Sequence, residues 1–224
     1  MDGVDDLSQV AQDYLKVIWS AVEWGEPPIT TKGLAARFAT TQANVSDTMR
    51  RLQARGLVDY QPYKPVTLTA LGERLAVQMV RRHRLIETFL AEVLGYAWDE
   101  VHDEAERLEH AVSDLLLRRI DDLVGHPRTD PHGDPIPGAD GGWEPPSGAV
   151  RLSAAPPGRY RVVRVADDDP ELLVRLKDAS IVPGAVVEVR DDEPRTVLVE
   201  AALPDPTPPG LSLGDLEGVR ARPV

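Results

Sequence analysis

A stretch rich in proline and glycine, residues 126–148, divides the sequence into two differently patterned parts. Before it, apolar residues recur at the three- and four-residue spacing of amphipathic helices. After it, runs of β-branched residues at 160–165, 186–189 and 196–199 predict strands, and residues 172–178 predict a short helix. Because Pro and Gly interrupt helices and strands alike, we expect residues 126–148 to be a linker that runs across the surface with little core of its own.

The composition limits the classes of protein to which the chain can belong. It has 224 residues, of which 42% are hydrophobic and 28% charged, as in globular proteins. It has no cysteine, which excludes disulfides, thiolate-bound zinc, iron–sulfur clusters and thiol nucleophiles. No apolar stretch approaches the roughly 18 residues of a membrane span, and residues 1–6 are acidic where a signal peptide is basic. We therefore expect a cytoplasmic protein with no membrane partner.

The charge is distributed unevenly along the chain. The formal net charge is -12, yet residues 29–84 carry ten Lys or Arg against three Asp or Glu. That region is therefore about +7 and the remainder about -19. A basic face on an acidic body is typical of a chain in which one module meets phosphate and another binds cations.

The basic region has the pattern of a helix-turn-helix. Apolar spacing predicts helices at about residues 7–24, 30–38 and 42–54, the second capped by Thr30 or Thr31. Gly56 stands where a left-handed cap would end the third helix. Short strands at 57–60 and 66–69 then predict a two-stranded wing.

In such a module the third helix enters the major groove of double-stranded DNA. Its short polar side chains would read base edges, while neighbouring Arg and Lys would contact phosphates. Asp47 fits either of two roles, accepting from a cytosine amino group or holding Arg50 or Arg51 in place. The predicted DNA-binding residues are Thr40, Thr41, Gln42, Asn44, Ser46, Asp47, Thr48, Arg50, Arg51 and Lys64.

The next two predicted helices, residues 70–94 and 99–124, carry imidazoles and carboxylates. His83 and Glu87 stand four residues apart, on one side of the first. On a helical wheel the second helix gathers its donors into one arc at the rim of its apolar face. Asp13 is placed in the same way on the first helix of the chain. The donors of the second helix are His102, Glu106, Glu109 and His110.

Three helices would thus direct oxygen and nitrogen donors toward one bundle interior, as in helical carboxylate metal sites. The absence of sulfur favours manganese or ferrous ion over copper(I), and zinc, cobalt and nickel would compete for the same donors. Solvated salt bridges are the alternative interpretation of these charges. A metallohydrolase that activates water on one or two ions is the alternative function.

The sequence resembles the diphtheria toxin repressor (DtxR) family of metal-dependent regulators over nearly its whole length. The likeness is carried by VHDEAERLEH at 101–110, RHRL at 82–85 and GDPIPG at 133–138. It implies a homodimer whose winged helices bind a palindromic operator once metal is bound, and which represses metal-uptake genes. One implied metal site uses His83, Glu87 and His102, completed from a C-terminal barrel, and the other uses Asp13, Glu106, Glu109 and His110.

The departures from the family pattern bear on the metal. Iron-responsive members usually have Met at the position of Asp13 and Cys at that of Glu106, so this chain resembles the manganese-responsive branch. Lys16 stands where some manganese regulators have a second carboxylate, which leaves the ligand number of the Asp13 site open. The anion-contacting residues of the family appear here as Asp130 and Asp134, so we do not extend that feature to this chain.

The region after the linker resembles the small SH3-like (FeoA-like) barrel of longer family members. There, two side chains beside the short helix complete the first metal site, and by position these fall near Asp169 and Leu172. Leu172 cannot bind metal, so Asp169 or Glu171 is the expected ligand. Both also fit as solvated acids at a helix N-terminus.

We therefore expect a mainly α chain. Its expected parts are a winged helix-turn-helix DNA-binding domain at 1–75, a helical dimerisation and metal-binding domain at 76–125, a linker at 126–150 and a barrel at 151–224. The predicted function is a manganese(II)-activated repressor that binds DNA as a homodimer and is not an enzyme. An iron(II)-dependent repressor of the same family is the alternative within that class. The prediction includes no small-molecule substrate.

Overall fold

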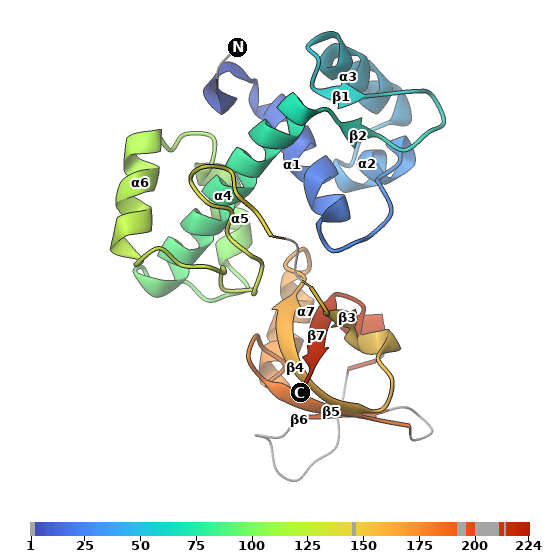
Figure 1. The fold of residues 1–224 in the computed structure, drawn as a ribbon, viewed down its shortest axis with the longest axis vertical. Coiled ribbons are helices and arrows are strands. Elements are labelled where there is room, and N and C mark those ends of the chain that lie inside the picture. The colour runs from blue at the N-terminus through green and yellow to red at the C-terminus, as the bar shows by residue number, and fades with distance from the viewer. Residues whose placement is uncertain (1–2, 145–146, 192–195, 200–210, 213) are drawn as a thin grey trace. The chain divides into compact units, whose positions relative to one another are not determined.

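The computed structural model describes residues 3–144, 147–191, 196–199, 211–212 and 214–224. The chain forms two compact units (Figure 1). The first comprises residues 1–83, 109–111 and 137–145, and the second comprises residues 84–108, 112–136 and 146–224. Among the described residues, no helix has the length and apolar character needed to cross a membrane.

The first unit contains the predicted helix-turn-helix. Its helices begin at capping side chains, because Ser8, Thr30 and Thr41 each accept a hydrogen bond from a backbone N–H three residues later. The elements are η1 (Val4–Asp6), α1 (Gln9–Glu23), α2 (Thr31–Arg37), α3 (Gln42–Ala54), β1 (Val58–Asp59), β2 (Thr67–Leu68) and the first part of α4 (Ala70–Glu92). The strands β1 and β2 pair antiparallel and form the predicted wing.

Close packing of the helices positions this wing. Leu15, Leu34 and Met49 of α1, α2 and α3 are fully buried in one core with residues of β1 and α4. A Cβ atom on Gly72 would lie 1.9 Å from the carbonyl oxygen of Leu57, so only glycine lets α4 approach the start of the wing this closely. Gly56 has φ +71°, as expected for the residue that ends α3.

The region that follows α4 corrects the prediction of one helix over 99–124. There are two helices, α5 (Val101–Leu108) and α6 (Asp114–Leu123), and residues 109–111 form a turn between them. Ser113 caps α6 by accepting from the backbone N–H of Leu116. The apolar spacing continues through the turn, which is why periodicity alone did not reveal the break. The helical wheel that placed Glu109 and His110 beside His102 was therefore wrong.

Residues 126–148 also differ from the expected surface linker. Thr129 and Pro135 form an isolated antiparallel bridge, and Asp130, His132 and Asp134 between them are buried. Backbone N–H groups of His132 and Asp134 donate to Asp130 Oδ1, at 2.9 and 3.0 Å. This part of the segment is thus an ordered turn.

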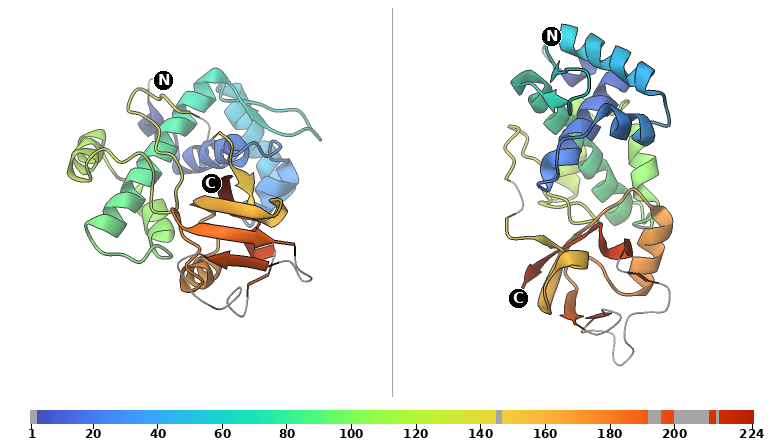
Figure 2. Two further views of the ribbon diagram at one scale, coloured as in Figure 1. Left: turned by 60° about the horizontal axis from the view of Figure 1, so that its bottom comes forward. Right: turned by 90° about the vertical axis from the view of Figure 1, so that its right-hand side faces the viewer.

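The rest of the second unit is a five-stranded antiparallel sheet of order β3-β7-β4-β5-β6 with one helix, seen from two further directions in Figure 2. The sheet shows that "mainly α" holds only in part. Leu173 and Leu176 of the helix are fully buried in the core of the sheet. The elements are β3 (Val150–Arg151), η2 (Leu152–Ala154), β4 (Gly158–Val165), α7 (Pro170–Asp178), β5 (Val186–Arg190), β6 (Thr196–Val199), η3 (Gly214–Leu216) and β7 (Val219–Pro223).

Candidate metal centre and nucleic-acid interface

Three donors of the first unit converge between α1 and the turn after α5. Asp13, Glu109 and His110 each offer a ligand atom, and these atoms lie within 4.8 Å of one another. His110 Nε2 is 3.0 Å from Asp13 Oδ1 and 3.8 Å from Glu109 Oε1. All three donors were predicted, but the turn at 109–111 brings Glu109 and His110 to Asp13.

The imidazole of His110 is held in one orientation by Gln12. Gln12 Nε2 donates to the carbonyl oxygens of Val4 and Leu7, so its Oε1 accepts from His110 Nδ1 at 2.7 Å. The proton on Nδ1 leaves the lone pair on Nε2, the nitrogen that faces Asp13. A second group that fixes the tautomer of a histidine ligand in this way is typical of metal sites. Gln12 was not among the predicted site residues.

Glu109 is fully buried and paired with two nitrogens. Lys16 Nζ lies 2.6 Å from its Oε1, and His83 Nδ1 lies 2.5 Å from its Oε2. Burial by itself raises the pKa of Glu109, but the charges and hydrogen bonds of His83 and Lys16 outweigh it and lower the pKa to about 2. Glu109 is therefore an anion at neutral pH, ready to bind a cation.

A second donor group lies in the second unit. Glu87 of α4, His102 of α5 and Asp167 after β4 offer ligand atoms within 4.8 Å of one another. His102 Nδ1 is 3.3 Å from Glu87 Oε1 and 2.9 Å from Asp167 Oδ2. On α4, His83 stands one turn before Glu87 and so projects from the same side of that helix.

Two carboxylates make His102 strongly basic. Burial alone lowers its pKa, but the hydrogen bonds to Asp167 and Glu87, together with their charges, raise it to about 11. For Asp167, burial raises the pKa, whereas the hydrogen bond and charge of His102 bring it well below its usual value. In the metal-free protein His102 is thus a cation between two anions.

The structure places the other predicted ligands elsewhere. Glu106 is half exposed on α5, 3.6 Å from His102 Nε2, and the Asp13 group does not include it. Asp169 caps α7 by accepting from the backbone N–H of Leu172, and Glu171 is exposed in the first turn of that helix. The barrel-side donor is Asp167, the first residue of the run 167–169. That acidic run before Pro170 was the signal in the sequence that could have revealed it.

Glu87 also belongs to a third group of donors, with Asp130 and His132. Burial, and then the charges of Asp134 and Glu87, raise the pKa of Asp130 well above its usual value. Asp130 had been set aside with the anion-contacting positions of the family, and His132 had no predicted role.

The donor chemistry of these groups fits a divalent metal ion. Carboxylate oxygen and imidazole nitrogen are the only donor types among them, which suits manganese(II), iron(II), cobalt(II) or zinc(II). When bound, the ion would supply positive charge that neutralises buried carboxylates. Asp13, Glu109 and His110 would hold one ion, and Glu87, His102 and Asp167 another.

The exposed face of α3 carries half of the ten predicted DNA-binding residues. Gln42, Asn44, Asp47, Arg50 and Arg51 are all exposed, as is Lys64 of the wing loop. Arg50 NH1 donates to Asp47 Oδ1 at 2.5 Å, so Asp47 holds Arg50. This contact favours the positioning role among the two open for Asp47.

The remaining predicted contacts are engaged within the fold. Thr41 Oγ1 accepts from the backbone N–H of Asn44, and Thr40 Oγ1 accepts from the Asn44 side chain. Thr48 is buried and accepts from Arg51, and Ser46 accepts from the hydroxyl of Tyr60. These hydroxyls orient α3 and its exposed side chains.

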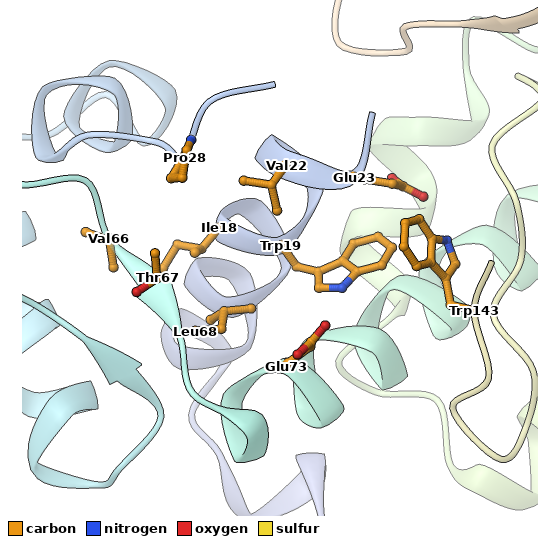
Figure 3. A pocket seen from close by; sticks show the side chains of 10 residues that line it. All are labelled: Ile18, Trp19, Val22, Glu23, Pro28, Val66, Thr67, Leu68, Glu73 and Trp143. Carbon is orange, nitrogen blue, oxygen red and sulfur yellow. The ribbon is translucent and has the colours of Figure 1, made fainter. Parts of the chain in front are cut away.

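An apolar pocket of about 220 Å³ lies beside α1 in the first unit (Figure 3). Trp19 of α1 and Trp143 line it with their rings at 73° and their centroids 5.1 Å apart. Glu23 and Glu73 also line it, without any imidazole. The pocket therefore lacks the donor set of a metal site, and the indole contact anchors residues 137–144 to α1.

Comparison with known proteins assigns a family to this arrangement. The domain described as "Iron dependent repressor, N-terminal DNA binding domain" matches residues 6–66. "Iron dependent repressor, metal binding and dimerisation domain" matches residues 69–138, and the FeoA domain matches residues 150–202. The iron-dependent repressor IdeR of Mycobacterium leprae is 35% identical over 208 residues, covering 88% of this chain and 90% of that protein. The chain belongs to the DtxR/IdeR family of metal-dependent repressors.

Other relatives agree with this assignment. The diphtheria toxin repressor of Corynebacterium glutamicum is 33% identical over 204 residues, which is 86% of this chain and 89% of that protein. A solved manganese-dependent transcriptional repressor in complex with manganese has a TM-score of 0.88 and 44% identity, and covers 96% of this chain and 100% of that one. The family consists of DNA-binding regulators and not of enzymes, which excludes the metallohydrolase alternative.

Proposed function

We propose that this chain is a manganese(II)-activated repressor that binds palindromic operators as a homodimer and controls genes for metal uptake. The observation that carries the proposal is the convergence of Asp13, Glu109 and His110 at the side of α1. These donors are oxygen and nitrogen only, and manganese(II) is a hard ion that prefers such donors and readily takes six of them. The likeness to a solved manganese-dependent repressor with bound manganese supports this choice of metal.

Iron(II) is the second candidate effector. It is favoured by the similarity to the iron-dependent repressors IdeR of Mycobacterium, at 35–36% identity. This chain has no cysteine, so no thiolate is present to favour iron at Asp13 or Glu106.

A physical path leads from the metal group to the DNA-binding helix within the first unit. Tyr14, the neighbour of Asp13 on α1, stacks on Phe38 at the end of α2 with ring centroids 4.1 Å apart. A cleft of about 400 Å³, lined by Asp13, Thr40 and Arg51 among others, lies between α1 and α3. These contacts would therefore transmit a shift of α1 to the helix-turn-helix.

Metal would act on this path by a population shift. Without metal, Asp13 and Glu109 are neighbouring carboxylates that repel one another, and a divalent ion would neutralise them and tie α1 to the turn at 109–111. A ligand can favour one conformation only by binding it better, and such couplings are about 1–3 kcal/mol, or about 5–150-fold in affinity.

The second unit offers a surface for the homodimer. Three leucines of α6, Leu115, Leu116 and Leu123, are 58%, 50% and 63% exposed, which is costly for large apolar side chains in water. The turn that follows α4 adds exposed Val93 and Leu94. A second copy that covers these residues would present two α3 helices to successive major grooves of a palindrome.

The test is fluorescence anisotropy with a palindromic fragment from the upstream region of the gene itself, at constant salt. We expect tight binding with manganese(II), weaker binding with zinc(II) or anaerobic iron(II), and loss of binding with chelator. The variant Asp13→Ala should lose at least the fivefold gain that manganese gives, because the α1 ligand is missing.

The matched control is Asp178→Ala, which removes an exposed carboxylate from α7 and should bind as the wild type does. Binding that is equal in chelator and in manganese would contradict the proposal. A larger gain with iron(II) than with manganese(II) would establish the iron-dependent alternative instead.

A further inference from the structure

His132 is a fully buried imidazole with its proton position determined by its surroundings. It is 0% exposed, and its Nε2 donates to the carbonyl oxygen of Trp98 at 2.7 Å. Because Nε2 carries the proton, the lone pair of the neutral ring is on Nδ1. Within the described part of the chain, this buried Nδ1 has no hydrogen-bond partner. Burying an acceptor without a donor costs folding free energy, so Nδ1 needs a hydrogen-bond donor or a metal ion.

Two buried carboxylates lie close to this imidazole. Glu87 is 0% exposed and Asp130 is 7% exposed, and each has an oxygen within 4.8 Å of a ring nitrogen of His132 and of the other's oxygen. Three acceptors gathered this closely repel one another unless a cation or a proton lies among them.

The two nearby guanidinium groups, those of Arg164 and Arg84, both contact Asp134. Arg164 Nε lies 3.0 Å from both oxygens of Asp134. Arg84 lies 3.6 Å from Asp134 Oδ1 and equally far from Asp130 Oδ2, so its positive charge is shared between the two carboxylates. Among the described residues, no hydrogen-bond donor reaches His132 Nδ1.

The backbone holds these donors on a rigid turn. Asp130 Oδ1 accepts from the backbone N–H groups of His132 and Asp134, which leaves Asp130 Oδ2 as its other donor atom. Gly133 has φ +91°, and a Cβ atom there would lie 2.0 Å from the carbonyl oxygen of Val163, so the turn is pressed against β4. Preorganised donors of this kind lower the cost of binding an ion.

We propose that Glu87, Asp130 and His132 bind a divalent cation that is separate from the ion of Glu87, His102 and Asp167. Glu87 Oε1 faces His102 at 3.3 Å, and Glu87 belongs to both donor groups, so this carboxylate would be shared by the two ions. The donors are hard, which fits manganese(II), iron(II), cobalt(II) or zinc(II). The bound ion would fasten the turn at residues 129–135 to α4. This site lies in the second unit and does not depend on DNA binding.

The test counts manganese ions per chain by equilibrium dialysis and elemental analysis of the full-length protein. We expect the wild type to bind one ion for each of the three donor groups. Asp130→Asn should bind one ion fewer, because the amide keeps the oxygen that accepts from the two N–H groups but loses the charge. His132→Phe should also bind one fewer, since it keeps a ring that stacks on Trp98.

Further variants separate this site from its neighbour. His126→Ala, which removes an exposed imidazole outside the three groups, is the matched control and should keep the wild-type number of ions. His102→Ala should lose one ion, while Glu87→Gln should lose two because Glu87 is shared. Circular dichroism checks that each variant is folded.

The proposal is overturned if the wild type binds only two ions per chain, or if folded Asp130→Asn and His132→Phe bind as many as the wild type. The count in the wild type decides the matter even if both variants fail to fold. Manganese-gated DNA binding with two ions per chain would refute this site alone, whereas three ions without gated DNA binding would refute the proposed function alone.

Discussion

Lys16 places its ammonium group 2.6 Å from Oε1 of Glu109, the carboxylate at the centre of the Asp13 group. The two side chains are almost fully buried, and Lys16 Nζ also lies 3.3 Å from His83 Nδ1. The ammonium group of Lys16 is thus a cation of the protein itself that contacts Glu109, one of the candidate metal ligands. Lys16 stands at a position where the family pattern varies. Its physical role here is to compensate the charge of buried Glu109.

We predict that Lys16→Met destabilises the metal-free protein. Removing one partner leaves Glu109 buried with less compensation, which costs about 3 kcal/mol for a buried pair. Because manganese(II) can replace the lost positive charge, it should raise the melting temperature more in the variant than in the wild type. Thermal unfolding with manganese and with chelator measures both effects.

The control for this prediction is Lys32→Met, which removes an exposed lysine from α2 and should leave the melting temperature nearly unchanged. Equal stability of Lys16→Met and the wild type in chelator would show that the Lys16–Glu109 pair contributes little.

We predict that metal binding at Glu87, His102 and Asp167 releases a proton. The pKa of His102 is raised to about 11, so between pH 7.5 and 9 the free protein carries a proton that the ion must displace. Affinity at this site should therefore rise about tenfold per pH unit in that window. Calorimetry in buffers of different ionisation enthalpy measures the protons released.

His102→Ala should lose this ion and its proton release together. Glu109, with its pKa lowered to about 2, contributes no proton in the same window. A wild-type protein that binds manganese with no proton release at pH 8 would contradict the assignment.

We predict that Leu123→Glu converts the dimer to a monomer. The side chain is 63% exposed in the single chain, and a buried charge at a dimer interface without a partner costs several kcal/mol. Size-exclusion chromatography with light scattering measures the mass. Val174→Glu, a matched change at an exposed valine of α7, should remain dimeric. A dimeric Leu123→Glu would move the interface away from α6.

We predict that Arg50→Ala weakens operator binding and lowers the salt dependence of the affinity. Each phosphate contact contributes about one unit to the slope of log affinity against log salt, so the slope should fall by about one. Asp47→Asn should weaken all operators alike, because Asp47 holds Arg50. A loss confined to operators changed at one base pair would instead assign base reading to Asp47. Arg190→Ala, in β5, is the matched control.

The helix-turn-helix was predictable because its signals are local. The expected limits of the third helix, 42–54, agree with those of α3, since Thr41 caps its start and Gly56 follows its end. The strand predicted at 186–189 agrees with β5, because its valines are likewise a local signal. The strands β3 and β7 were not predicted, because β3 has two residues and β7, with the sequence VRARP, has only one β-branched residue.

The grouping of the metal donors could not be predicted from local signals in the sequence. Their residue types were readable from the sequence, yet their grouping depended on a turn at 109–111 that keeps the apolar spacing of a continuous helix. Asp130 and His132 lie in a segment with the composition of a loop, and only its return against α4 and β4 brings them to Glu87. Such contacts join residues far apart in the chain, where periodicity carries no information.

By itself the sequence determined the capped helices, the basic module and the stock of oxygen and nitrogen donors, because each follows from neighbouring residues. Only the tertiary structure decided that Glu109 and His110 turn back to Asp13, that Asp167 meets His102, and that Lys16 sits against Glu109. Which donors share a cation depends on how helices end and pack, and packing is a property of the whole core.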